Sequence, residues 1–436
     1  MGQVVLRVPR SALIFPRETV YARTSGDAGP RRARAHCRVA ADVAFGDVER
    51  RHGPWRATWP TLLDFASGMP LLWPQSARER HGHEDVGQTL PGGRGHDTDS
   101  ARLPPPEEVF TVLPPTLTGR WATLPSEVDP CSPKVGGESG GGLLTAQIST
   151  FNSDVSAAQE LLPGVDFSSR AVRERFTWAW CIVNTRCFYF SPRQAQASNV
   201  TTRDDDDDEA MVLCPFIDLF NHAEAGCEVQ HDAGGFTVRA DRDYTRGEEL
   251  CTCYGPHGND TLFAEYGFLL PDSNQWDSVN IDGVVLASLT DSGGGARDLL
   301  RSRGYEGGYT LRPDGVCWRT EVAARAVVME SAEWGRFVDG VWADDDDDEE
   351  GAADGPHQRA RRLIRQWIEQ VGREAANSLR GLRAMAPHRI RRVFWDDGED
   401  QVATAAADEM AAARHALAVT RWEQILAAAR GALETV

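Results

Sequence analysis

The stretch of sequence that decides the fold lies between residues 215 and 268. It contains Pro215-Phe-Ile-Asp218-Leu-Phe-Asn221-His222, then Gly247-Glu-Glu-Leu-Cys-Thr-Cys-Tyr254-Gly255, and finally Glu265-Tyr266-Gly267-Phe268. Between the first two motifs, the pattern predicts strands over 227–231 and 236–240 with a turn at 232–235. A third strand is predicted over 249–254. Asn259 or Asp260 is a suitable N-cap for a short helix that ends at Gly267.

Outside this stretch, strands give way to longer helical patterns. The residues Val4 to Val8 predict a strand, and apolar residues at spacings of three and four predict one helix face before 188 and two helices beyond 290. The faces are formed by Phe176, Ala179, Trp180, Val183 and Cys187; by Leu363, Ile364, Trp367, Ile368, Val371, Ala375, Leu379 and Leu382; and by Met410, Ala413, Leu417, Ile425 and Leu426. Residues 74–142 are rich in Gly, Pro, His, Arg and Asp, which predicts an insertion ordered only around 107–113.

The charge of the chain is unevenly distributed. The 46 basic and 65 acidic residues of the 436-residue chain give a net charge of −19. Two tracts, 204–209 and 344–350, supply 13 of these excess negative charges, and we interpret both as solvated loops. Binding to nucleic acid requires clustered positive charges, and this chain is acidic overall. We therefore expect no direct nucleic-acid partner. A single lysine, Lys134, excludes a phosphate loop with Lys after Gly and argues against Schiff-base chemistry.

Nine cysteines are present, and no pair has the Cys-x-x-Cys spacing of a zinc ribbon or a thioredoxin motif. His222, Cys227 and His231 could be imagined as metal ligands, but a fourth ligand is not evident, so we expect no metal. No apolar run of 18 residues predicts a membrane span. We expect a reduced, intracellular protein in the cytoplasm or nucleus, and the Arg-rich first 40 residues make a mitochondrial transit segment the less favoured interpretation.

Three segments in order resemble the SET-domain protein methyltransferases, in the class that includes the Rubisco large-subunit lysine methyltransferase. The helix from Phe176 to Phe188 is similar to that class's helix ending in Ser-Arg-x-Phe. Asp218 to His222 resembles the Asp-x-x-Asn-His motif. The run from Gly247 through Tyr254-Gly255 to Tyr266-Gly267-Phe268 is similar to the class's Gly-Glu-Glu-Leu, Tyr-Gly and Tyr-Gly-Phe elements.

The resemblance implies a role for each site residue. Tyr254 would be the catalytic tyrosine at the point of methyl transfer, and Tyr266 and Phe268 would line the substrate lysine channel. Asn221 and His222 would hold S-adenosylmethionine, with Arg186 and Asp218 contacting cofactor or substrate. The planar fork of Arg186 suits the cofactor's carboxylate.

The implied fold is α+β, with a SET-domain β-fold of short strands and a pseudoknot. A helical or low-complexity insertion interrupts it, and an all-α C-terminal domain follows. We expect the N-terminal part of the SET domain over 1–73, the insertion over 74–170, the core with its motifs over 171–272, and a helical substrate-binding domain over 273–436. The expected partner is a protein that bears a target lysine, with no membrane, and we expect a monomer.

One departure from the family pattern leaves an alternative function open. SET domains begin with an Arg-Gly-x-Gly-like strand and a Gly-Glu turn, whereas Met1 to Pro9 resembles only the strand that follows them. The alternative is therefore a catalytically inactive SET-fold protein that acts as a protein-binding module. A serine hydrolase is disfavoured, because the Gly-x-Ser-x-Gly match at Ser139 lies among prolines and glycines and does not form a strand-to-helix turn.

Overall fold

The computed structural model describes residues 2–16, 33–82, 109–119, 121, 142–190, 211–271, 274–291, 295–340, 355–395 and 404–436. The chain divides into two compact units. Unit 1 comprises residues 1–71, 147–257 and 265–267, and unit 2 comprises 72–146, 258–264 and 268–436. Lys134, Ser139 and both acidic tracts lie outside the described residues. None of the described helices combines the length and apolar character needed to cross a bilayer.

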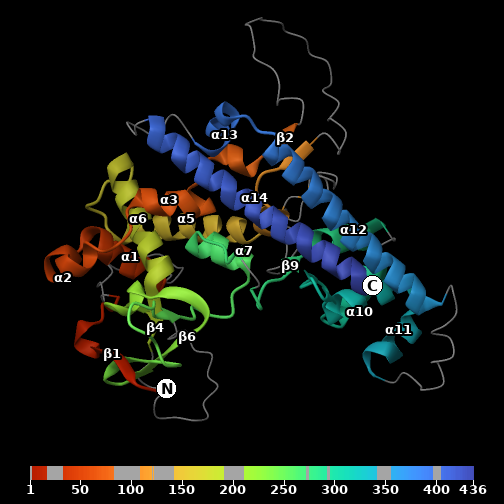
Figure 1. Cartoon of the computed structure of the whole chain (residues 1–436), viewed down its shortest axis with the longest axis horizontal. Coiled ribbons are helices and arrows are strands. Elements are labelled where there is room, and N and C mark those ends of the chain that lie inside the picture. The colour runs from red at the N-terminus through yellow and green to blue at the C-terminus, as the bar shows by residue number, and fades with distance from the viewer. Residues whose placement is uncertain are drawn as a thin grey trace, which may run out of the picture. The chain divides into compact units, whose positions relative to one another are not determined.

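The centre of unit 1 is a four-stranded sheet in the order β1-β7-β6-β8 (Figure 1). Its strands are β1 (Val4–Pro9), β6 (Asn221–Asp232), β7 (Gly235–Arg239) and β8 (Cys251–Thr252). β7 pairs antiparallel with β1 and β6, and β8 runs parallel to β6. The predicted strand at Val4 and the predicted hairpin are confirmed. The strand predicted over 249–254 is wrong in length, because only its two central residues pair.

Two further strands close the core of unit 1. β4 (Cys187–Tyr189) pairs antiparallel with β5 (Met211–Leu213). Apolar side chains from these strands, from the main sheet and from the segments next to them form one buried cluster: Val8, Leu13, Phe190, Val212, Cys214, Ile217, Cys227, Phe236 and Val238. Full burial of a large apolar side chain contributes roughly 1.5–3 kcal/mol, so this cluster anchors the strands that carry the site. Gly235, at φ 133°, allows β1 to approach β7, because a Cβ there would overlap the Val8 carbonyl.

Helices complete unit 1: α1 (Ala35–Phe45), α2 (Val48–Arg56), α3 (Leu62–Gly68), α5 (Leu143–Leu161, from residue 147 on) and α6 (Arg170–Arg186). The predicted face of α6 is confirmed for Phe176, Ala179, Trp180 and Val183, which are buried. It is wrong for Cys187, because the helix ends at Arg186 and Cys187 begins the strand β4. The Asp154 carboxylate of α5 accepts a hydrogen bond of 2.9 Å from the Trp180 indole and pairs with Arg34 at 2.5 Å. The Trp180 hydrogen bond joins α6 to α5, and the Arg34 ion pair joins the start of α1 to α5.

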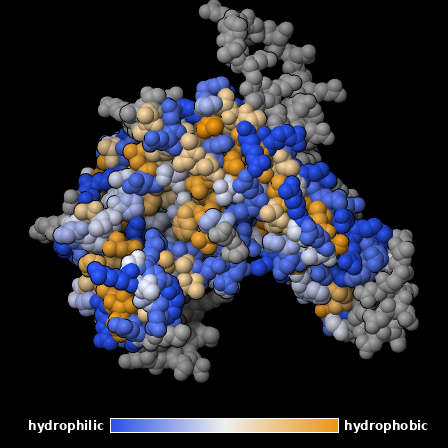
Figure 2. Space-filling model, viewed as in Figure 1, coloured by the Kyte–Doolittle hydropathy of each residue, from blue (hydrophilic) through white to orange (hydrophobic). Residues whose placement is uncertain are grey.

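Unit 2 is mainly helical. Its helices are α4 (Pro115–Thr118), α7 (Asn259–Thr261), α8 (Asp282–Asp291), α9 (Gly295–Ser302), α10 (Trp318–Val328), α11 (Ser331–Val338), α12 (Pro356–Arg383), α13 (Pro387–Phe394) and α14 (Thr404–Thr435). The long helices α12 and α14 lie side by side (Figure 1), and Figure 2 shows hydrophilic and hydrophobic residues interspersed along their surface. The predicted α+β arrangement with a helical C-terminal region is confirmed.

Unit 2 also contains short strands. β2 (Arg80–Gly82) pairs with β3 (Val109–Thr111), so the structure predicted around 107–113 is present. The prediction that 74–142 is ordered only there is wrong, because a 3-10 helix at Gln75–Arg78, β2 and α4 also lie in this range. β9 (Val279–Asn280), β10 (Thr310–Arg312) and β11 (Gly315–Val316) form a small sheet in the order β11-β10-β9. The all-α description of the region after 273 did not include this sheet. These strands are only two or three residues long, which leaves little periodicity in the sequence to detect.

The apolar face predicted for α14 is wrong in part. Ala413 is exposed, whereas Arg414 and Arg421 are 2% and 0% exposed. Arg421 pairs with Asp260 at 2.7 Å and with Asp277 at 2.7 Å, so charge pairing compensates for its burial. A pattern that counts apolar residues assigns arginine to solvent and therefore misplaces this face.

The N-cap predicted at Asn259 or Asp260 is also wrong. Gly258 is the N-cap of α7, and it makes no side-chain cap. The Asn259 side chain instead donates to the Leu270 carbonyl at 3.2 Å and to Gln424 at 3.0 Å. These polar residues are thus used for tertiary contacts within unit 2.

Candidate functional site

The site begins where two distant segments of the chain pair as parallel strands. Asn221 pairs with Cys251 and His222 with Thr252, which joins the Asp-x-x-Asn-His motif to the Gly-Glu-Glu-Leu run. The backbone N–H of Tyr254 donates to His222 Nδ1 at 3.1 Å, and its hydroxyl donates to the Phe220 carbonyl at 2.7 Å. Tyr254 is therefore fixed at both its backbone and its phenol by residues of the first motif.

Four aromatic rings form a continuous row around Tyr254. Its ring centroid lies 5.1 Å from that of His222 and 5.2 Å from that of Tyr266. Tyr266 in turn lies 6.0 Å from His257. We name these four residues the aromatic row. Such spacing is typical of interacting rings, and the row presents apolar faces with polar tips.

Burial shifts the pKa values of Tyr254, Tyr266 and His222 in the aromatic row. It raises the pKa of Tyr254 to about 12, with the Arg186 charge opposing it, and it raises the pKa of Tyr266 with help from the Glu265 carboxylate. Burial also lowers the pKa of His222, and the nearby His257 adds to this shift. A neutral imidazole agrees with the geometry, since His222 Nδ1 accepts the Tyr254 N–H. Near neutral pH, both tyrosines are hydrogen-bond donors and not bases.

A buried carboxylate anchors the loop before Asn221. The Asp218 side chain is 0% exposed, and it accepts hydrogen bonds from the Trp55 indole at 3.0 and 3.1 Å. Arg186 donates to the Asp218 carbonyl at 2.5 Å and lies 3.5 Å from its carboxylate. Burial raises the pKa of Asp218, and the Arg186 charge and the indole oppose the shift. In this conformation Asp218 holds Arg186 and the loop and is not open to a ligand.

Arg186 retains unused hydrogen-bonding capacity. Its Nε–H is buried and has no acceptor among the described residues. A buried donor without an acceptor costs roughly 1–3 kcal/mol. A bound carboxylate would satisfy it, and guanidinium groups bind carboxylates well.

The two glutamates of the Gly-Glu-Glu-Leu run hold other parts of the site. Glu248 closes its own turn, accepting from the Thr245 N–H at 3.0 Å and pairing with Arg242. Glu249 accepts from the Asn221 amide at 2.6 Å. Asn221 is exposed at the start of β6, so this contact orients an accessible amide. The spacing of the motif indicated both glutamates but not their partners.

Tyr266 lies in the π-helical turn η10 (Leu262–Tyr266), which ends at Gly267 with φ 80°. The last residue of α3, Gly68, packs directly on the Gly267 backbone, and a Cβ on Gly68 would overlap the Gly267 carbonyl. This close approach fixes the residue that follows Tyr266.

We expect Gly68→Ala to destabilise unit 1 and to displace Tyr266, because backbone atoms cannot move aside as a flexible side chain can. Overpacking of this kind costs about 1–3 kcal/mol. Chemical denaturation checks the free energy of unfolding. Gly164→Ala is the control, since a Cβ there meets nothing within 4 Å. Equal stability of the two variants would contradict the close packing.

Phe216 has an unusual backbone. Among the described non-glycine residues, Phe216 alone has a positive φ, at 69°. Its side chain is 58% exposed. The neighbouring Ile217 and Asp218 are buried, so one exposed aromatic ring lies beside the loop that supports Tyr254. Strained residues of this kind are frequent at functional sites. Nothing in the sequence indicated it.

The structure brings most of the predicted site residues together in unit 1. They are Arg186, Asp218, Asn221, His222, Tyr254 and Tyr266. Phe268 belongs to unit 2, where its N–H donates to the Leu262 carbonyl at 3.4 Å. No described group of three or more His, Cys, Asp or Glu side chains is arranged to hold a metal ion.

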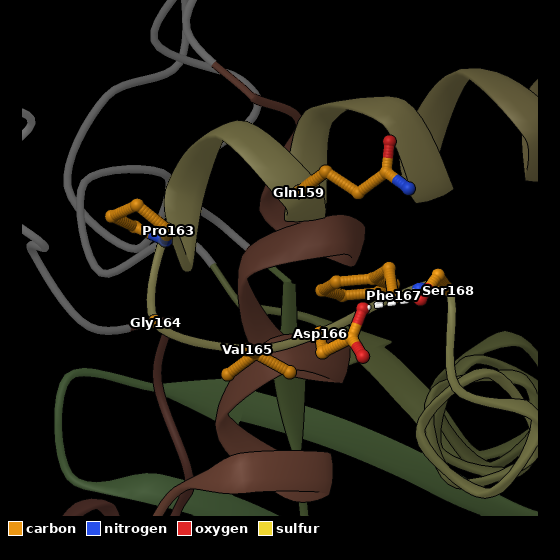
Figure 3. A pocket seen from close by; sticks show the side chains of 7 residues that line it. All are labelled: Gln159, Pro163, Gly164, Val165, Asp166, Phe167 and Ser168. Atoms are coloured by element: carbon orange, nitrogen blue, oxygen red, sulfur yellow. Dashed lines mark hydrogen bonds between the residues drawn. The ribbon is translucent and has the colours of Figure 1, made fainter.

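A separate depression of about 480 Å³ lies in the loop between α5 and α6 (Figure 3). It is formed by Gln159 and the consecutive residues 163–168. Its carboxylate, Asp166, already accepts from the Ser168 N–H at 3.0 Å and from the Ser168 hydroxyl at 2.6 Å. The Asp166 carboxylate is therefore already paired within its own loop.

The SET domain family model matches residues 3–255, which are 253 of the 436 residues. Ribosomal lysine N-methyltransferase set11 of Schizosaccharomyces pombe is 32% identical over 159 residues, covering 36% of this chain and 38% of that protein. SET domain-containing protein 4 of Homo sapiens is 30% identical over 161 residues, covering 35% of each chain. Ribosomal lysine N-methyltransferase 2 of Saccharomyces cerevisiae is 26% identical over 197 residues, covering 41% and 39%.

The matched region thus spans less than two fifths of the length of these three relatives. The family match, by contrast, covers more than half of this chain and includes Arg186, Asp218, Asn221, His222 and Tyr254. The chain belongs to the SET-domain family.

Proposed function

We propose that the protein transfers a methyl group from S-adenosylmethionine to a lysine side chain of a protein substrate. The observation that carries this proposal is the aromatic row, in which two neutral tyrosines pack 5.2 Å apart beside the Asn221-His222 pair. Methyl transfer to an amine is an in-line displacement that needs alignment and exclusion of water more than acid or base catalysis. A narrow apolar channel with fixed hydroxyls suits that requirement.

Two features of the chain fit the cofactor. The buried Nε–H of Arg186 would donate to its carboxylate, and Asn221 and His222 would hold the adenine side. When bound, the cofactor supplies an electrophilic methyl group on a sulfonium. The residues of the chain do the rest: Arg186 and Asn221 orient the cofactor, and the two tyrosines exclude water and align the substrate amine.

The catalytic assignment rests on Tyr254. Its hydroxyl is held by the Phe220 carbonyl, and its pKa of about 12 keeps it protonated. We infer that Tyr254 orients the reacting groups and polarises the methyl, and that Tyr266 lines the lysine channel. We also propose that Phe268 and the helical region after 273 contribute to binding the protein substrate.

The names of two relatives support a ribosomal protein as the substrate class. Both are ribosomal lysine N-methyltransferases, from two different yeasts. We therefore propose that this chain also modifies a lysine of a ribosomal protein.

Titration calorimetry with S-adenosylmethionine tests the cofactor pocket. We expect micromolar binding to the wild-type chain. Asn221→Ala should weaken it about tenfold, or ~1.4 kcal/mol, because the amide that Glu249 orients is lost. Asn152→Ala, at an exposed position of α5, is the matched control. Absence of binding at millimolar cofactor would contradict the proposal.

A further inference from the structure

We propose that Glu265 is a positioning residue that sets the orientation of Tyr266 in the lysine channel. The inference rests on the proposed function, since it assigns a purpose to Tyr266. It concerns a residue outside both the Asp-x-x-Asn-His motif and the Gly-Glu-Glu-Leu run.

Three hydrogen bonds hold Glu265 to two helices of unit 1. Its Oε2 accepts from the Asn184 amide of α6 at 2.8 Å and from the Gln147 amide of α5 at 2.8 Å. The same Asn184 amide also donates to the Glu265 backbone carbonyl at 3.0 Å. Gln147 is only 4% exposed, so its contact is shielded from water. One amide thus fixes both the side chain and the backbone of Glu265.

These contacts restrain Tyr266 from its N-terminal side. On the C-terminal side, Gly267 packs against Gly68. Tyr266 therefore lies between two anchored neighbours, at the end of a π-helical turn. π-helical turns occur frequently at functional sites.

The position of the Tyr266 ring must be precise, because this ring packs on Tyr254. A misplacement of about 1 Å in a group that aligns reactants can cost on the order of 10²-fold in rate. An ionised carboxylate with two amide donors is stronger than a neutral acceptor, and it suits a residue that must hold one geometry. The Glu265 charge also contributes to the raised pKa of Tyr266, which places the two side chains in one electrostatic environment.

The test compares two single variants with their double. In Glu265→Gln, the new amide N–H faces the amide N–H of Gln147 or Asn184, so two donors meet. In Gln147→Glu, a second carboxylate lies beside that of Glu265. The double variant Gln147→Glu/Glu265→Gln reverses the polarity of that hydrogen bond and keeps an acceptor for Asn184. We expect each single variant to lower kcat by about tenfold or more, and the double variant to recover to within about threefold of wild type.

Calorimetry separates positioning from loss of folded protein. We expect the affinity and stoichiometry of cofactor binding to be unchanged in all three variants, so that kcat per bound cofactor falls. Glu160→Gln, at an exposed position of α5, is the control. A fall in stoichiometry that parallels the fall in kcat would overturn the proposal in favour of a purely structural role. Wild-type kcat in Glu265→Gln would also overturn it.

A second readout does not depend on activity. With 3-fluorotyrosine incorporated, the Tyr266 resonance is assigned by its loss in Tyr266→Phe. We expect this ¹⁹F resonance to shift in Glu265→Gln and to return toward its wild-type position in the double variant. If the wild-type chain transfers no methyl group, the proposed function fails, and this resonance still tests the positioning. An unchanged resonance in Glu265→Gln would refute it.

Discussion

Replacing Tyr254 with phenylalanine is expected to lower methyl transfer by roughly 10²- to 10³-fold, the range seen when one preorganised donor is removed from a catalytic site. The hydroxyl is the only group lost, and its partner is a backbone carbonyl 2.7 Å away. The ring contacts with His222 and Tyr266 remain, so the fold and the cofactor affinity should be preserved. Single-turnover rates with saturating cofactor measure the effect.

The same variant distinguishes two roles for the hydroxyl. Burial raises the pKa of Tyr254 to about 12, so the phenol stays protonated across the working pH range. If the hydroxyl orients the reacting groups and polarises the methyl, kcat of Tyr254→Phe should be lower at every pH, and its pH profile should keep the wild-type shape. If it were a general base, the profile would lose a limb. Tyr189→Phe is the control, because Tyr189 is 43% exposed. Wild-type turnover in Tyr254→Phe would contradict the assignment.

Replacing Arg421 with methionine is expected to destabilise unit 2 by about 3–5 kcal/mol, because the change leaves the buried Asp260 carboxylate and the partly exposed Asp277 carboxylate without their partner. Arg421 is 0% exposed and contacts Asp260 through two hydrogen bonds of 2.7 and 2.9 Å, and Asp277 at 2.7 Å. Burial alone lowers the pKa of Arg421, but the two carboxylates outweigh it and raise the pKa. The pairing therefore compensates for the burial.

Urea denaturation measures the free energy of unfolding of this variant. Arg430→Met, at an exposed position of the same helix, should change it by less than about 0.5 kcal/mol. Adding Asp260→Asn and Asp277→Asn to Arg421→Met should recover part of the loss, since no buried charge then lacks a partner. An Arg421→Met protein as stable as the control would show that the pair contributes nothing.

Local patterns in the sequence predicted the strands and helices whose formation depends on residues close together in the chain. The hairpin of β6 and β7 follows from alternating residues around a turn, and α6 and α12 follow from apolar residues at helical spacing. The fold class came from three motifs in order. The position of Arg421 could not be predicted, because its burial depends on acids about 150 residues away that only the folded chain brings near.

The site divides in the same way. Motif spacing in the sequence groups Asn221, His222 and Tyr254. In the structure, Asn221 and His222 pair in parallel with Cys251 and Thr252, and the Tyr254 N–H donates to His222. The Trp55–Asp218 hydrogen bond joins residues 163 apart in sequence, and the left-handed backbone of Phe216 has no residue type that signals it. The partners of Glu265 come from two helices, so no local pattern reveals them. Motif spacing in the sequence thus indicates candidate site residues better than it indicates the residues that support them.

The most direct test of the central claim is transfer of an isotopically labelled methyl group from S-adenosylmethionine to ribosomal proteins, located by mass spectrometry. The chain offers a favourable background, because Lys134→Arg removes its single lysine and any labelled lysine then belongs to the substrate. We predict label on a lysine side-chain amine that is lost in Tyr254→Phe. Cofactor binding without label on any lysine, or label that persists in Tyr254→Phe, would contradict the account.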